Sequence, residues 1–580
     1  MKKWRRLLLV TVLALLLVAC QAGGDLKGRK PSPDWSRSRP IGADVRGRIA
    51  MAVEGAGEKI HLAWPQAMED QIGIHYKQLD QRAQTVAEHA LPLPEGASRS
   101  TRLLLSADNR LHLFWARRVS GETWNLWYAG LNDQGELVRD PVQLSPSGSD
   151  VGDYSAIQDP AGNLLVVWGD GNGRQVVGLR IPEGRPPSDP QVLGDGESPS
   201  LSVDETGNAH LVWREENQIR YAALPGGDLA PGAGVRVADL TLSFGDAVTG
   251  PVLGTAGGWG YVFWSIFSQS GLEAGTGRTE YVTFPLDSPA PSRPERLAFL
   301  PDERQSYVAY DGAFPLTQVA LPPTLAYLNT DFVGDPDVAR GPGGELAVAV
   351  AVNQELRQQT TIQLAVMLLA DGEPLGYQMA AKTPNLSVEG NLTLDEAEHL
   401  HLAWREGAGG LSAYYATTAP EARAVLDRLT TADVANVLLT ATAEGMSGLV
   451  FLPFAAVWSV PGLLLLGLWK LRRDDEHIDQ LGSRIVVTVA IVIYEVIKLL
   501  FMPGILSYVP FSAWLDVPPN VRPILLYGTP FFIIAMGVLV AEIVRRRRDE
   551  TPTIGYYFAV VGVDAALTLL VYGVNFMGVF

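Results

Sequence analysis

Four of the eight histidines occupy the same place in a recurring phrase, three residues before a tryptophan. They are His61, His112, His210 and His401. Imidazole is a common metal ligand and general base, so this recurrence suggests a repeated metal site. Equivalent positions of a repeated fold lie in different repeats, however, and a shared packing role explains the recurrence more simply. We therefore predict half-buried strand histidines, hydrogen-bonded to a neighbouring repeat, and no metal or other cofactor.

Charged pairs directly follow two of these tryptophans, as Arg214-Glu215 and Arg405-Glu406. The loops of a repeated β-structure converge where such strands end. These four residues are therefore candidates for contacting a ligand, and solvated strand ends are the alternative interpretation.

A third group of charges lies in apolar sequence near the C-terminus. Glu495 and Lys498 are one helical turn apart, and Asp564 follows in a later apolar segment. Because a charge within a membrane costs about 3 kcal/mol, such residues are either paired or functional. The first interpretation is a neutralising pair that fixes helix packing. The second is a transport or signalling component, in which the three residues relay protons or bind a polar partner helix.

The histidine and tryptophan phrase recurs about 50 residues apart, which is the length of one four-stranded propeller blade. Clear copies end at Trp168, Trp213 and Trp404, and a position equivalent to the tryptophan is Val350. Looser copies end at Trp64, Trp115 and Trp264. Each contains a strand, a tight turn with Asp, Gly or Asn, and another strand, and in five copies a strand that carries tyrosine follows. The pattern predicts an all-β propeller of seven blades. Eight blades result if residues 265–349 hide a degenerate copy, and six if a weak copy is only a hairpin.

The copy at Ser202–Trp213 resembles the blade phrase of BNR-repeat or sialidase-like propellers, and the resemblance covers about residues 41–418. It implies blades and not catalysis, because sialidases also carry an arginine triad, an Asp acid/base and a Tyr/Glu pair. Arg180-Ile181-Pro182 is similar to the sialidase segment whose arginine holds the substrate carboxylate. Here it follows the third copy and is typical of a turn between blades, so Arg180 is only a weak candidate for facing a ligand.

The first residues have the form of an export signal. Residues 1–19 combine basic residues with a short apolar run, and Leu17–Cys20 resembles the lipobox of bacterial lipoproteins. This resemblance implies that Cys20 is lipidated; the alternative is an uncleaved signal anchor with an incidental cysteine. Residues 20–40 lack apolar periodicity and are predicted to be a flexible tether. Because Cys20 is the only cysteine, internal disulfides are excluded.

Residues 447–580 are predicted to be a helical transmembrane domain. Four apolar segments, each long enough to span a bilayer, lie at about 447–469, 485–506, 523–544 and 554–579. The basic loops at 470–473 and 545–548 should be cytoplasmic. This places the propeller, at 41–419, and the C-terminus outside a bacterial cell membrane. Residues 420–446 show helical periodicity and are predicted to form an amphipathic connecting helix.

The net charge of −17 belongs to residues 1–446, since the C-terminal part is balanced. An acidic exported part argues against nucleic acid as a partner. We predict a non-catalytic recognition or scaffold module for a glycan or protein. Its membrane domain anchors it in the lipid bilayer or joins it to the subunits of a membrane complex. The alternatives are a sialidase-like glycoside hydrolase, which needs two carboxylates or a Tyr/Glu pair in the central funnel, and the transport or signalling component.

Overall fold

The protein is described by a computed structural model that covers residues 31–576 with gaps. The gaps are residues 69–70, 119–120, 122, 231–233, 271–273, 301–306, 309–311, 313, 319–331, 357–358, 384, 408–410, 432, 434, 436–448, 450, 473–476, 503–504, 506–507, 511–519 and 548–549. The chain divides into a propeller unit that ends at Arg428 and a helical unit that begins at Leu429.

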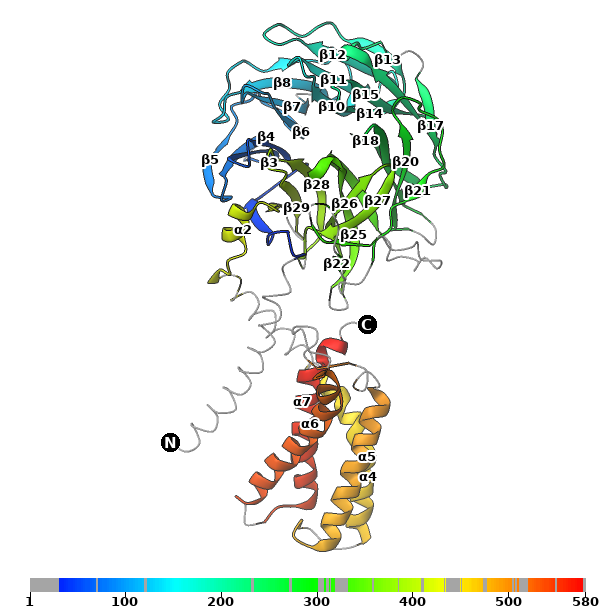
Figure 1. The fold of residues 1–580 in the computed structure, drawn as a ribbon. Coiled ribbons are helices and arrows are strands. Elements are labelled where there is room, and N and C mark those ends of the chain that lie inside the picture. Colours follow the sequence, from blue (N-terminus) through cyan, green and yellow to red (C-terminus); the bar gives the residue numbers. More distant parts are fainter. Residues whose placement is uncertain are drawn as a thin grey trace. The chain divides into compact units, whose positions relative to one another are not determined.

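The propeller unit consists of seven antiparallel sheets arranged as blades around a central axis (Figure 1). Blades 1 to 3, from the axis outward, contain β2 (Ala50–Glu54), β3 (Lys59–Ala67), β4 (Ile72–Asp80) and β5 (Thr85–Ala90); β6 (Ala97–Leu105), β7 (Leu111–Arg118), β8 (Asn125–Leu131) and β9 (Val142–Gln143); and β10 (Val151–Gln158), β11 (Leu164–Asp170), β12 (Gln175–Ile181) and β13 (Gln191–Asp195). Blades 4 and 5 contain β14 (Glu197–Val203), β15 (Ala209–Glu215), β16 (Gln218–Leu224) and β17 (Val235–Asp239); and β18 (Asp246–Ala256), β19 (Trp259–Ser268), β20 (Gly277–Pro285) and β21 (Glu295–Arg296). Blades 6 and 7 contain β24 (Val333–Arg340), β25 (Leu346–Leu356), β26 (Gln359–Ala370), β27 (Glu373–Met379), β23 (Leu316–Thr317) and β22 (Tyr307–Val308); and β28 (Ser387–Leu394), β29 (Leu400–Glu406), β30 (Ser412–Thr417) and β1 (Arg39–Gly42).

The tryptophan phrase marks the second strand of six blades, and a tyrosine that follows it marks the third strand of five. The tryptophans pack between blades; Trp115 of blade 2, for example, joins Ile74 and Tyr76 of blade 1 in one buried cluster. Val350 takes this place in blade 6 and is also fully buried. The repeat is therefore explained by burial of one large apolar side chain per blade interface.

The predicted count of seven blades is confirmed, and the long interval between Trp264 and Val350 is an insertion. Blade 6 has six strands because β22 and β23, which precede it in the sequence, extend its outer edge next to β27. An eighth, degenerate blade is thus not needed to account for this segment.

The last blade is composite, because its outer strand comes from the start of the chain. Arg39 and Pro40 of β1 pair with Tyr415 and Tyr414 of β30. The prediction of a tether over 20–40 is therefore wrong from residue 31 onward. Trp35 is fully buried in a cluster shared by blades 6 and 7. One buried aromatic residue and a short edge strand fix a segment that shows no apolar periodicity.

The segment after the propeller begins with α2 (Pro420–Leu426), whose Ala422 and Leu426 pack against blades 1 and 7. Of the predicted connecting helix over 420–446, the structure describes the first part as a helix that packs against the propeller. Residues 436–446 lie outside the described residues.

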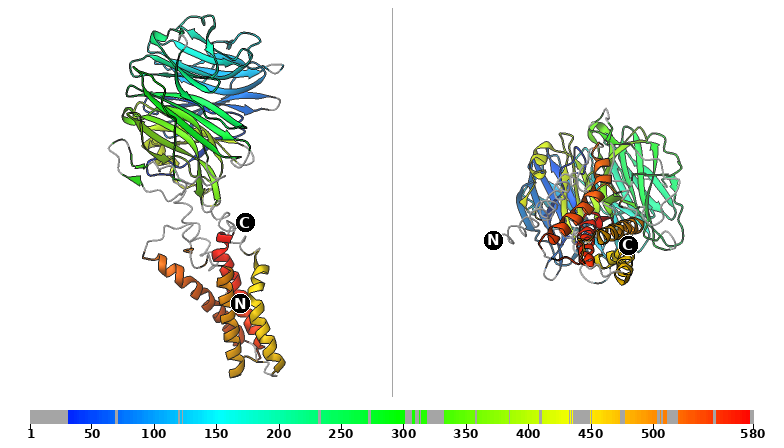
Figure 2. Two further views of the ribbon diagram at one scale, coloured as in Figure 1. Left: turned by 90° about the vertical axis from the view of Figure 1, so that its right-hand side faces the viewer. Right: turned by 90° about the horizontal axis from the view of Figure 1, so that it is seen from below.

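Four long helices make up the described helical unit (Figure 2, yellow to red). They are α4 (Leu452–Arg472), α5 (Leu481–Phe501), α6 (Arg522–Arg545) and α7 (Thr553–Phe576). Helix α7 contacts the other three. Two of the described helices, over Arg522–Arg545 and Thr553–Tyr572, are long and apolar enough to cross a membrane. Helix α5 carries Arg484, Glu495 and Lys498 within its apolar sequence.

Candidate functional site

The four recurring histidines bond to tyrosines of the same blade. Their Nδ1 atoms lie 2.6 to 2.9 Å from the hydroxyl of the third-strand tyrosine in the pairs His61–Tyr76, His112–Tyr128, His210–Tyr221 and His401–Tyr415. The predicted partner in a neighbouring repeat is therefore wrong. Nε2 of His210 lies 3.0 Å from Asp204, so this nitrogen carries the proton and Nδ1 accepts the hydroxyl hydrogen. Among the described residues, no three His, Cys, Asp or Glu side chains are placed to hold a metal.

We expect these histidines to make the propeller sensitive to acid. Burial lowers the pKa of His61 and of His112 to about 4, from 6.5 in the unfolded chain. Between these values the unfolded chain binds more protons, so stability that is present above pH 6.5 is lost as the pH falls toward 4. At pH 4.5 each histidine should cost about 2–3 kcal/mol relative to pH 7, as measured by denaturant unfolding followed through tryptophan fluorescence.

The double variant His61→Gln/His112→Gln should flatten this acid dependence of the propeller. His477→Gln, in the helical unit, is the matched control and should leave the dependence unchanged. An identical loss of stability in wild type and double variant would assign the acid response to other groups.

Six of the seven innermost strands contain a β-bulge at the same place, near their first residues. A bulge leaves one residue unpaired and turns neighbouring side chains out of the ladder, here on the strands that line the central channel. The bulge residues Ser100, Ser198, Asp335 and Glu389 have φ between 51° and 54°, a region that disfavours side chains. We call the face of the propeller at which the innermost strands begin the channel face.

Charged side chains concentrate near the bulges of blades 6, 7 and 2 and at the start of the innermost strand of blade 1. The channel cluster, as we call it, comprises Arg48, Arg102, Asp335, Asp337, Glu389 and Arg405. Its members are half-buried, and positive and negative groups lie within electrostatic reach of one another.

Two ion pairs organise the channel cluster. Nη1 of Arg405 lies 2.6 Å from both carboxylate oxygens of Glu389. Nη2 of Arg48 lies 3.4 Å from Oδ1 of Asp337 and donates to the Gly390 carbonyl at 2.9 Å. Each pair therefore leaves guanidinium N–H groups available to a ligand.

Burial shapes the electrostatics of the cluster. Desolvation raises the pKa of Asp335, although Arg48 and Arg405 oppose this rise. Desolvation likewise lowers the pKa of Arg102, against the attraction of Asp337. Three guanidinium groups and three carboxyl groups thus share one partly dehydrated site.

The repeat symmetry does not account for this cluster. The residues equivalent to Asp335 in blades 2 to 5 are Ser100, Gly152, Ser198 and Gly250. A position needed only for blade packing would keep its residue type, as the histidine and tryptophan positions largely do. Among the six bulges, charged residues at this position are therefore confined to blades 6 and 7.

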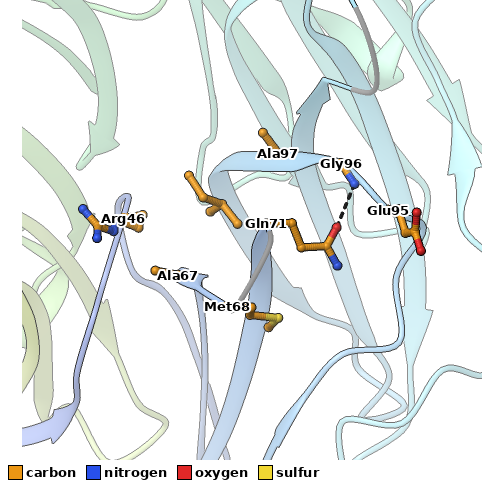
Figure 3. Close-up of a pocket in the computed structure, with 8 residues that line it drawn as sticks. Arg46, Ala67, Met68, Gln71, Glu95, Gly96 and Ala97 are labelled. Atoms are coloured by element: carbon orange, nitrogen blue, oxygen red, sulfur yellow. Dashed lines mark hydrogen bonds between the residues drawn. The ribbon is translucent and has the colours of Figure 1, made fainter.

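Further features lie on the channel face. Figure 3 shows a depression between blades 1 and 2, lined by Arg46, Ala67, Met68, Gln71, Ile72, Glu95, Gly96 and Ala97. Gln71 accepts the Gly96 N–H at 3.0 Å across it. Arg46 is two residues from Arg48, so the depression and the channel cluster share one segment of blade 1.

Two aromatic side chains also lie on this face. Phe244, in the loop before β18, is 99% exposed. Its loop is fixed because Asp246 accepts the Ser243 N–H at 2.9 Å and Ser270 donates to the Phe244 carbonyl at 3.0 Å. Trp124 lies between the guanidinium groups of Arg99 and Arg118, at 4.1 and 4.8 Å. Apolar contact area is thus available beside the charges.

The charged residues singled out in the sequence have different surroundings. Arg405 belongs to the channel cluster, whereas Glu406 is buried, accepts the Trp404 indole N–H at 3.1 Å and has a pKa raised by burial. Arg214 pairs with Glu197 at 2.9 Å on the channel face.

The two remaining candidates, Glu215 and Arg180, form ion pairs within their own blades. Glu215 pairs with Arg220 of the adjacent strand at 2.7 Å. Arg180 lies on the opposite face, where its Nη2 is 3.0 Å from Asp159 in the turn that ends β10. It therefore lies away from the channel cluster.

In the helical unit, the structure brings Glu495, Lys498 and Asp564 together. Nζ of Lys498 lies 2.8 Å from Glu495 and 2.8 Å from Oδ2 of Asp564, across helices α5 and α7. Cys20 lies outside the described residues.

Sequence reasoning missed most of the channel cluster. Arg48, Arg102, Asp335, Asp337 and Glu389 precede the recurring phrase and belong to no motif. Aligning the repeats on their tryptophans would have placed Asp335 and Glu389 at one position, 15 residues upstream, together with Asp153; the other copies carry Ile49, Ser100, Ser198 and Thr249 there.

Comparison with known proteins shows the fold alone. No family model and no curated protein sequence matches the chain. Among solved structures, the chain is similar to the polysaccharide lyase Uly1, with 9% identity, a TM-score of 0.39 and coverage of 63% of this chain and 89% of that one. It is also similar to the Dos1 propeller, with 9% identity, a TM-score of 0.36 and coverage of 67% and 96%. For the Trypanosoma rangeli sialidase the identity is 10%, the TM-score 0.32 and the coverage 67% and 56%.

Proposed function

We propose that the protein is a membrane-anchored, extracytoplasmic recognition module that binds a glycan on the channel face of its propeller. The channel cluster is the observation that carries this proposal. It gathers partly desolvated donors and acceptors where the fold does not require them, and clustered ionisable groups with perturbed pKa values are typical of functional positions.

The chemistry of the cluster favours a hydroxyl-rich ligand. Guanidinium N–H groups donate to hydroxyl oxygens, and carboxylates accept hydroxyl hydrogens. Since the three positive and three negative groups balance, a ligand of strong charge would have to break the existing ion pairs. Phe244 adds an apolar surface on the same face, suited to the less polar face of a sugar ring.

The helical unit supports the membrane anchor. Its surface is apolar, with Leu500 71% and Phe531 74% exposed, while Lys498 and Asp564 are buried. This arrangement is the reverse of a soluble protein and fits a lipid environment. The basic loops, the export signal and Cys20 are consistent with a propeller held outside a bacterial membrane. Apolar helix faces of this kind also suit subunits of a membrane complex.

One observation favours a second function, that of a glycoside hydrolase. Asp335 has a pKa raised by burial, and Glu389 beside it is held by Arg405. A carboxyl group with a raised pKa close to a second carboxyl group is the arrangement of acid and nucleophile or base in glycosidases. Release of reducing ends from a bound glycan, lost in Asp335→Asn while binding persists, would establish this function in place of pure recognition.

Binding to a glycan array by the full-length protein in detergent tests the proposal. The variant Glu389→Gln/Arg405→Gln removes one ion pair of the channel cluster and should weaken glycan binding at least about tenfold. The variant Asp159→Asn/Arg180→Gln removes a similar pair on the opposite face and should bind as wild type does. The proposal would be contradicted if both variants lost glycan binding equally. It would also be contradicted if the wild-type protein bound no glycan, or bound only protein partners.

A further inference from the structure

We propose that the helical unit contains a proton-binding site, in which the carboxyl groups of Glu495 and Asp564 share one proton beside the ammonium group of Lys498. The bound species is the proton itself, and the site bridges helices α5 and α7. The proposal goes beyond ligand recognition by the propeller and does not depend on it.

The ammonium group of Lys498 contacts the carboxylates of both Asp564 and Glu495. Its Nζ lies 3.0 and 2.8 Å from the two oxygens of Asp564 and 2.8 Å from Oε2 of Glu495. The Tyr494 hydroxyl donates to Oδ2 of Asp564 at 2.7 Å. An ammonium group has three N–H donors, and these contacts account for them.

The charges do not balance. One ammonium group faces two carboxylates, so the cluster carries one net negative charge when both acids are ionised. The side chains of Lys498 and Asp564 are 1% and 0% exposed, and that of Glu495 is 23% exposed. An uncompensated charge in such a place is strongly disfavoured, and a carboxylate relieves it by taking up a proton.

An unpaired atom marks where this proton belongs. Oε1 of Glu495 is buried and has no hydrogen-bond partner, while Oε2 of Glu495 and Oδ2 of Asp564 each lie 2.8 Å from the same atom, Nζ of Lys498. Two carboxylate oxygens can only accept, so they form a bond only when a proton lies between them. One proton therefore neutralises the cluster and satisfies the buried oxygen.

The surroundings offer no second cation among the described residues. Helix α5 adds Tyr494, and α7 adds Tyr557 near it. Helix α4 presents Trp458 to Tyr494 at 6.5 Å and has no ionisable residue before Lys470. The ionisable residues of helix α6 are Arg522 and Tyr527 in its first two turns and Glu542 and Arg545 in its last turn. With no second cation among the described residues of these helices, we assign the neutralisation of the cluster to a proton.

Infrared spectroscopy of the full-length protein in detergent at pH 7 tests the proposal through the C=O band of protonated carboxyl groups. The number of protonated carboxyl groups expected in the cluster equals its number of acidic side chains minus its number of cations. The intensity of the C=O band should follow this number. Wild type should show one protonated group more than Glu495→Gln, and Asp564→Asn should lose the same intensity because the remaining carboxylate then pairs with Lys498. Lys498→Met should gain one. Protonated groups of the propeller are shared by all variants and cancel in the differences.

Glu542→Gln is the matched control, since Glu542 pairs with Arg545 and Arg546 at the end of α6 and should leave the band unchanged. A spectrum of Glu495→Gln identical to wild type would overturn the proposal, because the wild-type cluster would then hold no proton. A band that disappears in Glu495→Gln but persists in Asp564→Asn would also overturn it, since a shared proton needs both acids. These two variants decide the matter even if Lys498→Met does not fold.

Discussion

Replacing Lys498 by leucine should lower the unfolding free energy of the helical unit by about 3–5 kcal/mol, because two buried carboxyl groups lose their cation. Lys498 is 1% exposed and contacts both Glu495 and Asp564 at 2.8 Å. Replacing the entire buried network by apolar residues is often neutral or stabilising. The triple variant Glu495→Leu/Lys498→Leu/Asp564→Leu should therefore unfold close to wild type. Denaturant unfolding of the detergent-solubilised protein measures both.

The exposed Lys470, at the end of α4, provides a control for removing a lysine. Lys470→Leu should change stability by less than about 1 kcal/mol. If the Lys498 variant is as stable as this control, the cluster is not a strained buried network. If the triple variant is as unstable as the single one, packing and not charge determines the loss.

Replacing Trp35 by alanine should lower the unfolding free energy of the propeller by about 3–5 kcal/mol, as expected for deleting a fully buried tryptophan. Trp35 is 0% exposed and lies among residues of blades 6 and 7 that include Leu364 and Trp404. Its loss also weakens the anchor of β1, the strand that completes blade 7. Urea unfolding followed by circular dichroism measures the effect.

Phe244→Ala is the matched control, because this aromatic side chain is 99% exposed. It should alter stability by no more than about 0.5 kcal/mol. A Trp35 variant with wild-type stability would show that the segment before β1 contributes nothing to ring closure.

The blades were predictable because their signals are local. A tryptophan on the second strand, a tyrosine on the third and an Asp-x-x-Gly turn recur within one blade. In the turn of blade 4, Asp204 accepts the backbone N–H groups of Thr206 and Asn208 at 2.9 Å each. Burial alone would raise the pKa of Asp204, but hydrogen bonds from His210 and this turn lower it to about 2. Local chemistry of this kind is readable from sequence.

The non-local parts were not predictable in the same way. The place of β1 depends on a pairing with β30 at the far end of the propeller sequence, and a polar segment of this kind resembles a tether. The proximity of Asp564 to Lys498 needs the packing of α7 on α5, although the helical spacing of Glu495 and Lys498 was visible. In the channel cluster, Arg405 was singled out for its position after a tryptophan, whereas Glu389 carries no sequence signal except its misfit among equivalent positions.

The composite last blade has a consequence for how the chain is made. A polypeptide is synthesised from its N-terminus, so β1 appears before any other described strand of the ring. Its partner, β30, is the last strand of the propeller to follow. Until then β1 is an unpaired edge, and blade 7 has no completed sheet. Strands so far apart in the sequence pair slowly, because the entropy of loop closure is lost before the contacts between them can form. We expect this propeller to close late, in one step, and the polar character of residues 36–40 to keep the waiting strand from pairing with other chains.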